Sequence, residues 1–193
     1  MRTFLKRKLP LNKALKILLI TNSFTLLAGA MLGPIYALFV EEIGGDLLDA
    51  SFAGGAYALS AGITVYLSGK YADKIRRDEI IIIVGYSIMG LGFLSYIIVD
   101  SIWLLLIAQV IVGLGEAVYS PAFDKLYSKH LDAHREATEW GSWESMYYFA
   151  TAIGAVVGGT VATIFGFKVL FVIMSALCFA SALYIFRLPK RTL

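Results

Sequence analysis

Six long apolar runs constrain this chain more than any other feature of its sequence. Each run is long enough to cross the hydrocarbon core of a bilayer as a helix, which needs about 20 residues. The expected transmembrane helices are 16–40, 48–69, 80–99, 102–123, 143–165 and 169–186. Short charged stretches separate these runs. Residues 1–193 are therefore expected to form one six-helix domain of an all-α membrane protein.

The composition excludes a soluble domain and a disordered chain. Hydrophobic residues make up 59% of the sequence, charged residues 16%, and the mean hydropathy is +0.75. Soluble domains average about 45–50% apolar and about 25% charged residues. The net charge of +3 is divided among short loops, so a bilayer rather than a nucleic acid is the expected partner. The single cysteine, Cys178, lies in an apolar run, which leaves no disulfide framework and no Cys-based metal site.

Lysine and arginine are distributed asymmetrically along the chain. With six crossings, 16 of the 17 basic residues fall on one side of the membrane, and only Lys168 falls on the other. That other side holds several acidic residues, among them Asp46 and Asp100. The positive-inside rule then places both termini in the cytoplasm. The expected location is the cytoplasmic (inner) membrane, with a multi-pass topology.

Polar and small residues form stripes at helical spacing on the first, second, fourth and fifth expected helices. The third and sixth are almost uniformly apolar, so we expect four helices to line a polar interior and two to face lipid. Alternatively, the small residues only permit close helix packing, and the hydroxyls bond to their own helix. The expected cavity residues are Asn22, Thr25, Tyr36, Tyr57, Ser60, Thr64, Gln109, Glu144, Tyr148 and Thr151.

Glu116 is an acidic residue well inside the fourth expected helix, between Gly115 and Ala117. A charge at the bilayer centre costs roughly 2.5–3.5 kcal/mol on insertion scales, and such residues usually serve an ion or substrate path. Burial favours the neutral carboxylic acid, which suits a group that binds and releases a proton. A structural hydrogen bond to a tyrosine or an amide is the alternative. Glu116 is the candidate for proton coupling.

Two segments resemble signatures of the major facilitator superfamily. Residues 69–77 read GKYADKIRR, which is similar to the family pattern G-x-L-A-D-R-x-G-R-R between its second and third helices. Residues 109–117 read QVIVGLGEA, which resembles the fourth-helix pattern R-x-x-x-G-x-G-x-A, with Gln109 in place of the arginine. Glu116 matches an acid that the family's anion:cation symporters use for proton coupling.

The resemblance implies the N-terminal half of such a transporter, a half-size bundle of three-plus-three inverted repeats. Gly33-Pro34 and Ser120-Pro121, late in the first and fourth helices, are a faint sign of that repeat. The resemblance also implies a cytoplasmic latch, a set of acidic and basic residues that favours the outward-facing state. Arg76 is a further basic residue next to this set in the sequence. Solvated anchors at the membrane surface are the alternative for these charges. The latch residues are Gly69, Asp73, Lys74, Arg77 and Asp124.

The expected function is movement of a small solute by alternating access, with proton coupling. No nucleotide-binding or hydrolase pattern occurs in the sequence, so neither an enzyme nor a cofactor or metal site is expected. Polar stripes without a facing partner favour a homodimer, and the start at Met1 with a short tail after the sixth helix favours a complete small protein. A non-transporting membrane subunit and a truncated N-terminal half of a larger transporter remain the alternatives.

Overall fold

The computed structural model describes residues 11–75, 77–189 and 193. Over these residues the chain is helical with no strand, and six spans are long and apolar enough to cross a membrane, which confirms the expected fold class. Seven of the basic residues in the charge count lie outside the described residues: Arg2, Lys6, Arg7, Lys8, Arg76, Lys190 and Arg191.

The first span consists of three pieces, and each later span is built on one long α-helix. The pieces of the first are α1 (Lys13–Leu32), the 3₁₀ turn η1 (Gly33–Ile35) and α2 (Tyr36–Glu42). The others are α3 (Leu47–Ala72), α4 (Asp78–Ser95) with η2 (Tyr96–Ile98), α5 (Ile102–Lys129), α6 (Glu136–Phe165) and α7 (Phe167–Phe186).

Most helices extend beyond the apolar runs that reveal them. The fourth span continues to Lys129 and the fifth begins at Glu136, because polar turns outside the apolar run keep the helical backbone hydrogen bonds. Side-chain hydrogen bonds cap the N-termini of two helices, α1 and α3. The Asn12 side chain accepts a hydrogen bond from the backbone N–H of Leu15 at 2.8 Å, and Asp46 forms a capping box with Asp49.

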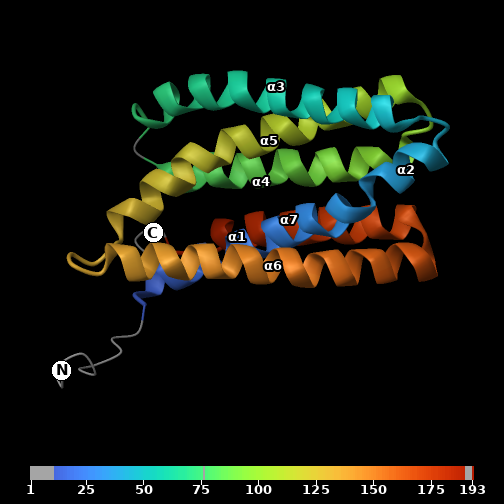
Figure 1. Ribbon diagram of the computed structural model, residues 1–193. Helices are drawn as coiled ribbons and strands as arrows, with labels where there is room; N and C mark the ends of the chain where they lie inside the picture. Colours follow the sequence, from blue (N-terminus) through green and yellow to red (C-terminus); the bar gives the residue numbers. More distant parts are fainter. Residues whose placement is uncertain (1–10, 76, 190–192) are drawn as a thin grey trace.

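The helices lie roughly along one direction, and the loops gather at two ends (Figure 1). The basic end carries residues 73–75, 77 and 130–135 together with the described terminal residues. The acidic end carries residues 43–46, 99–101 and Gly166. At the acidic end Gly166 joins α6 to α7 with a φ of +81°, a backbone conformation that favours glycine.

The packing of the helices divides the bundle into two matching three-span units. In one half of the bundle α5 packs against α3 and α4, and in the other half α1 packs against α6 and α7. The α4 and α7 helices pack against each other in the middle (Figure 1). Replacing each span by the one three places away along the chain turns the first set of contacts into the second, and spans three places apart run in opposite directions, so the two sets are related by an inverted repeat. This is the three-plus-three arrangement expected from the sequence.

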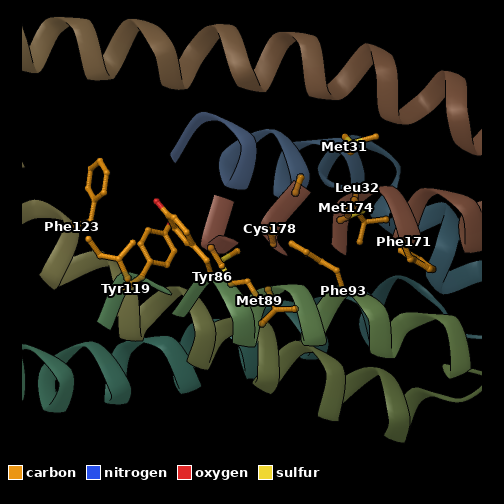
Figure 2. Close-up of a cluster of buried hydrophobic side chains, with 14 of the residues drawn as sticks. Met31, Leu32, Tyr86, Met89, Phe93, Tyr119, Phe123, Phe171, Met174 and Cys178 are labelled. Atoms are coloured by element: carbon orange, nitrogen blue, oxygen red, sulfur yellow. The ribbon is translucent and has the colours of Figure 1, made fainter. Parts of the chain in front are cut away.

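Aromatic and aliphatic side chains fill the space between α1, α4, α5 and α7 (Figure 2). Tyr86 on α4 and Tyr119 on α5 are buried, with ring centroids 4.7 Å apart. Glycines bring these two helices together, since a Cβ on Gly85 would lie 2.5 Å from the Cβ of Tyr119. Small residues at a helix interface allow such close backbone approach.

The third and sixth spans are less exposed than their sequences suggest. In α4 and α7, 44% of the most apolar window is buried inside the chain, compared with 6% in α3 and 17% in α6. Both helices still expose apolar side chains on their outer faces, such as Leu91 on α4 and Val172 on α7, so the expectation that these helices face lipid stays a prediction. Apolar side chains suit lipid and a protein core equally well, so hydropathy does not distinguish the two environments.

Candidate functional site

A cavity of about 420 Å³ opens between the first span, α3, α4 and α5, in the half of the bundle nearer the acidic end. Small residues on two helices make room for it, and no charged side chain of the described chain lines it. The aromatic side chains of Tyr36, Tyr57, Phe93 and Tyr96 form much of its wall. Such a chamber suits a ligand with apolar surface and few charges.

Tyr36 and Gln109 supply polar groups to this cavity. The Tyr36 hydroxyl is buried without a hydrogen-bond partner among the described residues, although the Gln109 side chain lies close to it. Leaving a buried hydroxyl without a hydrogen bond costs about 1–3 kcal/mol. A ligand that forms a hydrogen bond with the Tyr36 hydroxyl would therefore bind more tightly. The structure thus brings three predicted cavity residues, Tyr36, Tyr57 and Gln109, around one space.

Glu116 lies just outside that lining, and Tyr57 joins it to the cavity. The Tyr57 hydroxyl on α3 donates a hydrogen bond to Oε2 of Glu116 on α5. Both side chains are partly buried. A hydrogen bond to a tyrosine is the structural alternative that the sequence analysis gave for Glu116. The observed bond is therefore compatible both with that structural role and with a role in proton coupling.

Ser60 and Gly113 fix the backbone beside this pair. The Ser60 hydroxyl donates to the backbone oxygen of Tyr57 at 2.9 Å and to that of Val110 at 3.4 Å. A Cβ on Gly113 would lie 2.7 Å from the Tyr57 backbone oxygen, so α3 and α5 are in direct backbone contact here. Ser60 is therefore part of the helix interface and does not line the cavity.

Asn22 and Thr25 lie away from the cavity, in the contact between α1, α4 and α7. Both are 1% exposed, and the Tyr86 hydroxyl donates to Oδ1 of Asn22 at 3.3 Å. The Thr25 hydroxyl donates to the backbone oxygen of Thr21, within its own helix, at 3.5 Å. Asn22 does not face lipid in the single chain, because neighbouring helices already enclose it.

The remaining predicted cavity residues lie on the outer faces of α3 and α6. Glu144, Tyr148 and Thr151 are exposed, and Thr64 is half-buried. None of the four lines the cavity in the single chain. They would face a central path only if a second protein surface covered these two helices.

The predicted latch residues lie at the basic end without joining one another. Arg77 pairs with Glu79, its Nε 2.9 Å from Oε1, and the Lys74 amine lies 6.0 Å from the centre of the Tyr71 ring. Gly69 is half-buried at the end of α3. Asp73 and Asp124 are exposed, and neither has an ion pair within residues 11–75 and 77–189.

Asp78 is the buried acid at this end, and the sequence interpretation missed it. Its side chain is 2% exposed and pairs with two lysines of α5, with Lys125 Nζ 2.8 Å from Oδ1 and Lys129 Nζ at Oδ2. The Lys125 amine also donates to the backbone oxygen of Ala72 at 2.5 Å. This ion-pair cluster joins the ends of α3, α4 and α5. The i, i+4 spacing of the two lysines was its only signal in the sequence.

Glu139 is a second buried acid that the sequence interpretation missed. It is fully buried near the start of α6, and its Oε2 accepts a hydrogen bond from the backbone N–H of Asp132 at 2.8 Å. Its backbone oxygen accepts the hydroxyl of Tyr127 at 2.5 Å. These bonds fold residues 130–135 onto the ends of α5 and α6, which indicates a structural role.

Comparison with known proteins agrees with this architecture. The family model of the Major Facilitator Superfamily matches residues 18–193. The chain is 26% identical over 172 residues to the multidrug resistance protein MdtG of Dickeya zeae, an alignment that covers 86% of this chain and 42% of that protein. The MdtG of Proteus mirabilis is 26% identical over 189 residues, covering 93% and 46%.

An archaeal relative shows the same relation of lengths. An uncharacterised MFS-type transporter of Methanocaldococcus jannaschii is 24% identical over 161 residues, or 83% of this chain and 42% of that protein. The chain thus spans less than half the length of the curated relatives it matches. With six membrane-spanning helices and a family match over nearly its whole length, the chain belongs to the Major Facilitator Superfamily, a family of membrane transporters.

Proposed function

We propose that this chain forms half of an alternating-access transport path that moves a small solute across the cytoplasmic membrane. The observation that carries the proposal is the uncharged, aromatic cavity, together with an acid one hydrogen bond away from it. A solute held between the first span, α3 and α5 sits where relative movement of helices would open and close its access.

The solute is neutral or cationic in this proposal. The described parts of the six spans carry Lys and Arg only near their ends, so no positive group inside the bundle compensates an anion. Tyr36, Tyr57 and Tyr96 offer aromatic faces, which attract cations and pack against apolar surface. The MdtG relatives are multidrug resistance proteins by name, which favours a family of organic solutes over one metabolite.

Glu116 is the proton-binding group in this proposal. It is partly buried in the middle of a span, and no ion pair compensates its charge within the described chain. Acidic residues at this depth in a membrane protein usually belong to an ion or proton path. Binding and release of this proton would couple the two orientations of the path to the proton gradient.

A second copy of the chain completes the path in this proposal. The α3 and α6 helices are the least covered of the six, and α6 exposes the polar groups of Glu144, Tyr148 and Thr151. Polar groups facing hydrocarbon are unfavourable, and a copy rotated by two-fold symmetry about the membrane normal would place α3 of one chain against α6 of the other. The relatives' double length supports a path of two such halves.

The proposed function also includes an orientation of the chain in the membrane and a cytoplasmic latch. The basic end faces the cytoplasm, following the positive-inside rule. There Asp73, Lys74, Arg77 and Asp124 are exposed and available to contact the other half when the path opens outward, with Gly69 at the close of α3. Asp78 already holds the α3–α4 connection in place within the chain.

A transport measurement on the purified full chain tests this function. A thermal-shift screen of neutral and cationic aromatic compounds selects a ligand, whose uptake into vesicles is then followed under an imposed pH gradient. Glu116→Gln should insert and fold normally, retain binding and lose gradient-driven uptake, because the amide mimics a permanently protonated acid. Glu41→Gln, an exposed acid at the acidic end, is the matched control. An unchanged pH profile in Glu116→Gln would reduce Glu116 to a structural residue.

A further inference from the structure

Tyr57 both lines the cavity and forms a hydrogen bond to the proposed proton site. Its hydroxyl donates to Glu116, which does not line the cavity. A solute in the cavity and a proton on Glu116 would therefore both lie next to the phenol group of Tyr57. This inference rests on the proposed function, because it assigns the connection between the solute site and the proton site.

The backbone of Tyr57 has little freedom to move. Its backbone oxygen accepts the Ser60 hydroxyl, which also reaches Val110 on α5, and Gly113 is in backbone contact with the same turn. About two helical turns nearer the basic end, the Ser68 hydroxyl donates to the backbone oxygen of Ala117 at 2.6 Å. With α3 and α5 fixed to each other, a change at Tyr57 is a change of its side chain alone.

Two further tyrosines of the described chain lie near the Tyr57–Glu116 pair. Tyr119 lies near Glu116 on the same helix, with its ring against that of Tyr86 on α4, and Tyr147 of α6 lies near Tyr57. None of these forms a hydrogen bond to Glu116 within the described chain. Tyr57 is thus the donor that stabilises the carboxylate form.

A tyrosine hydroxyl has one proton to donate. A solute acceptor in the cavity, such as a carbonyl oxygen, competes with Glu116 for this single donor. When the solute takes the bond, the carboxylate loses its stabilising partner and takes up a proton from water to become a carboxylic acid, while Tyr57 keeps its own proton.

We propose that Tyr57 is the positioning residue that couples solute binding to protonation of Glu116, through exchange of its hydroxyl bond between the carboxylate and a hydrogen-bond acceptor on the solute. By linkage, lower pH then favours solute binding and solute binding favours protonation. The proposal adds a requirement to the solute, namely an acceptor group that reaches the wall of the cavity.

A cavity filled covalently tests the coupling without a known substrate. Gly54 lines the cavity, and a side chain there meets no atom within 4 Å, so Gly54→Cys in a Cys178→Ala background accepts a label. Phenacyl bromide adds a carbonyl acceptor, and 2-phenylethyl iodide adds a hydrocarbon of matching length. Mass spectrometry verifies complete labelling.

The readout is the midpoint of Glu116 protonation in infrared difference spectra, assigned by its absence in Glu116→Gln. The phenacyl label should shift this midpoint to higher pH, and the phenylethyl label should shift it less. Tyr57→Phe should raise the midpoint without any label and abolish the response to phenacyl. Tyr66→Phe, an exposed tyrosine on the same helix, is the control and should behave as the parent.

Two results would overturn the inference and separate it from the proposed function. If Glu116 titrates but neither Tyr57→Phe nor the phenacyl label moves its midpoint, Tyr57 does not couple the sites, and Glu116 remains a proton site. If Glu116 does not titrate while the protein stays folded, the proton coupling of the proposed function fails as well, and this inference fails with it.

Discussion

The carboxylate of Asp78 lies 2.8 Å from the Nζ of Lys125, and this pair ties the first turn of α4 to the last turns of α5. Lys129 adds a second amine to the same carboxylate, and Lys125 also reaches the end of α3 through the backbone oxygen of Ala72. Three helix ends therefore depend on one acid that is 2% exposed. Neutralising it leaves two amines without their charge partner.

We expect Asp78→Asn to lower the free energy of unfolding by about 1–3 kcal/mol, less than for a fully buried pair because both lysines are partly exposed. Unfolding by denaturant in mild detergent, followed by circular dichroism, measures the loss. Asp73→Asn is the control, an exposed acid five positions earlier in the chain. Equal stability of the two variants would show that the cluster contributes nothing beyond surface charge.

Gly158 allows α6 to approach α1, and its neighbour provides a matched control. A Cβ on Gly158 would lie 2.0 Å from the backbone oxygen of Met31, whereas a Cβ on Gly159 meets nothing within 4 Å. Gly158→Ala should destabilise the protein by about 1–3 kcal/mol, because the backbones must separate. Gly159→Ala should leave stability unchanged or raise it by about 0.5–1 kcal/mol, through helix propensity. Similar melting temperatures in both variants would contradict the close contact.

Topology is tested by single cysteines in a Cys178→Ala background. A membrane-impermeant maleimide added to intact cells should label cysteines at Asp46 and Asp100, because both positions lie at the acidic end and are exposed. A cysteine at Lys74 should react only after the cells are permeabilised. Labelling at position 74 in intact cells would reverse the proposed orientation or change the number of crossings.

The proposed dimer predicts proximity between α3 of one copy and α6 of another. Chains with a cysteine at Thr64, mixed in native membranes with chains carrying one at Thr151, should give a dimer band with a short bifunctional crosslinker. Val172→Cys, exposed on α7, is the control and should remain monomeric. A protein that is monomeric in mild detergent and transports as single copies in vesicles would exclude the dimer; a separate second half would remain the competing partner.

The sequence predicted the helices well because each apolar run falls within the roughly 17–25 residues that a transmembrane helix requires. It predicted the helix ends less well, because the turns at Lys129 and Glu136 are polar and still helical. The stripe on the first span shows a further limit. Tyr36 lines the cavity and Asn22 is enclosed between helices, although both are polar residues on one span. Only the packing of the neighbouring helices separates these two environments.

The sequence revealed one partly buried acidic residue and missed two buried ones. Glu116 stood out because apolar residues surround it in the chain. Asp78 and Glu139 did not, because each lies in the first turn of a helix next to charged neighbours, where a carboxylate is ordinarily solvated. Their burial comes from residues brought in by folding, such as Lys125 and Tyr127, and sequence spacing alone does not reveal such contacts.

The partners of α1 have a consequence for biogenesis. This helix is synthesised before the other five described spans, yet it packs mainly against α6 and α7. Its last residue, Leu32, and the first residue of α6, Glu136, are 104 positions apart. The buried Thr21 backbone oxygen receives its bond from Ser181, near the end of the last span. During insertion, α3, α4 and α5 can associate as soon as they enter the membrane. The polar groups of α1 stay without their partners until α6 and α7 have been inserted. The contacts of α1 are therefore completed only after α7 has left the ribosome and entered the membrane.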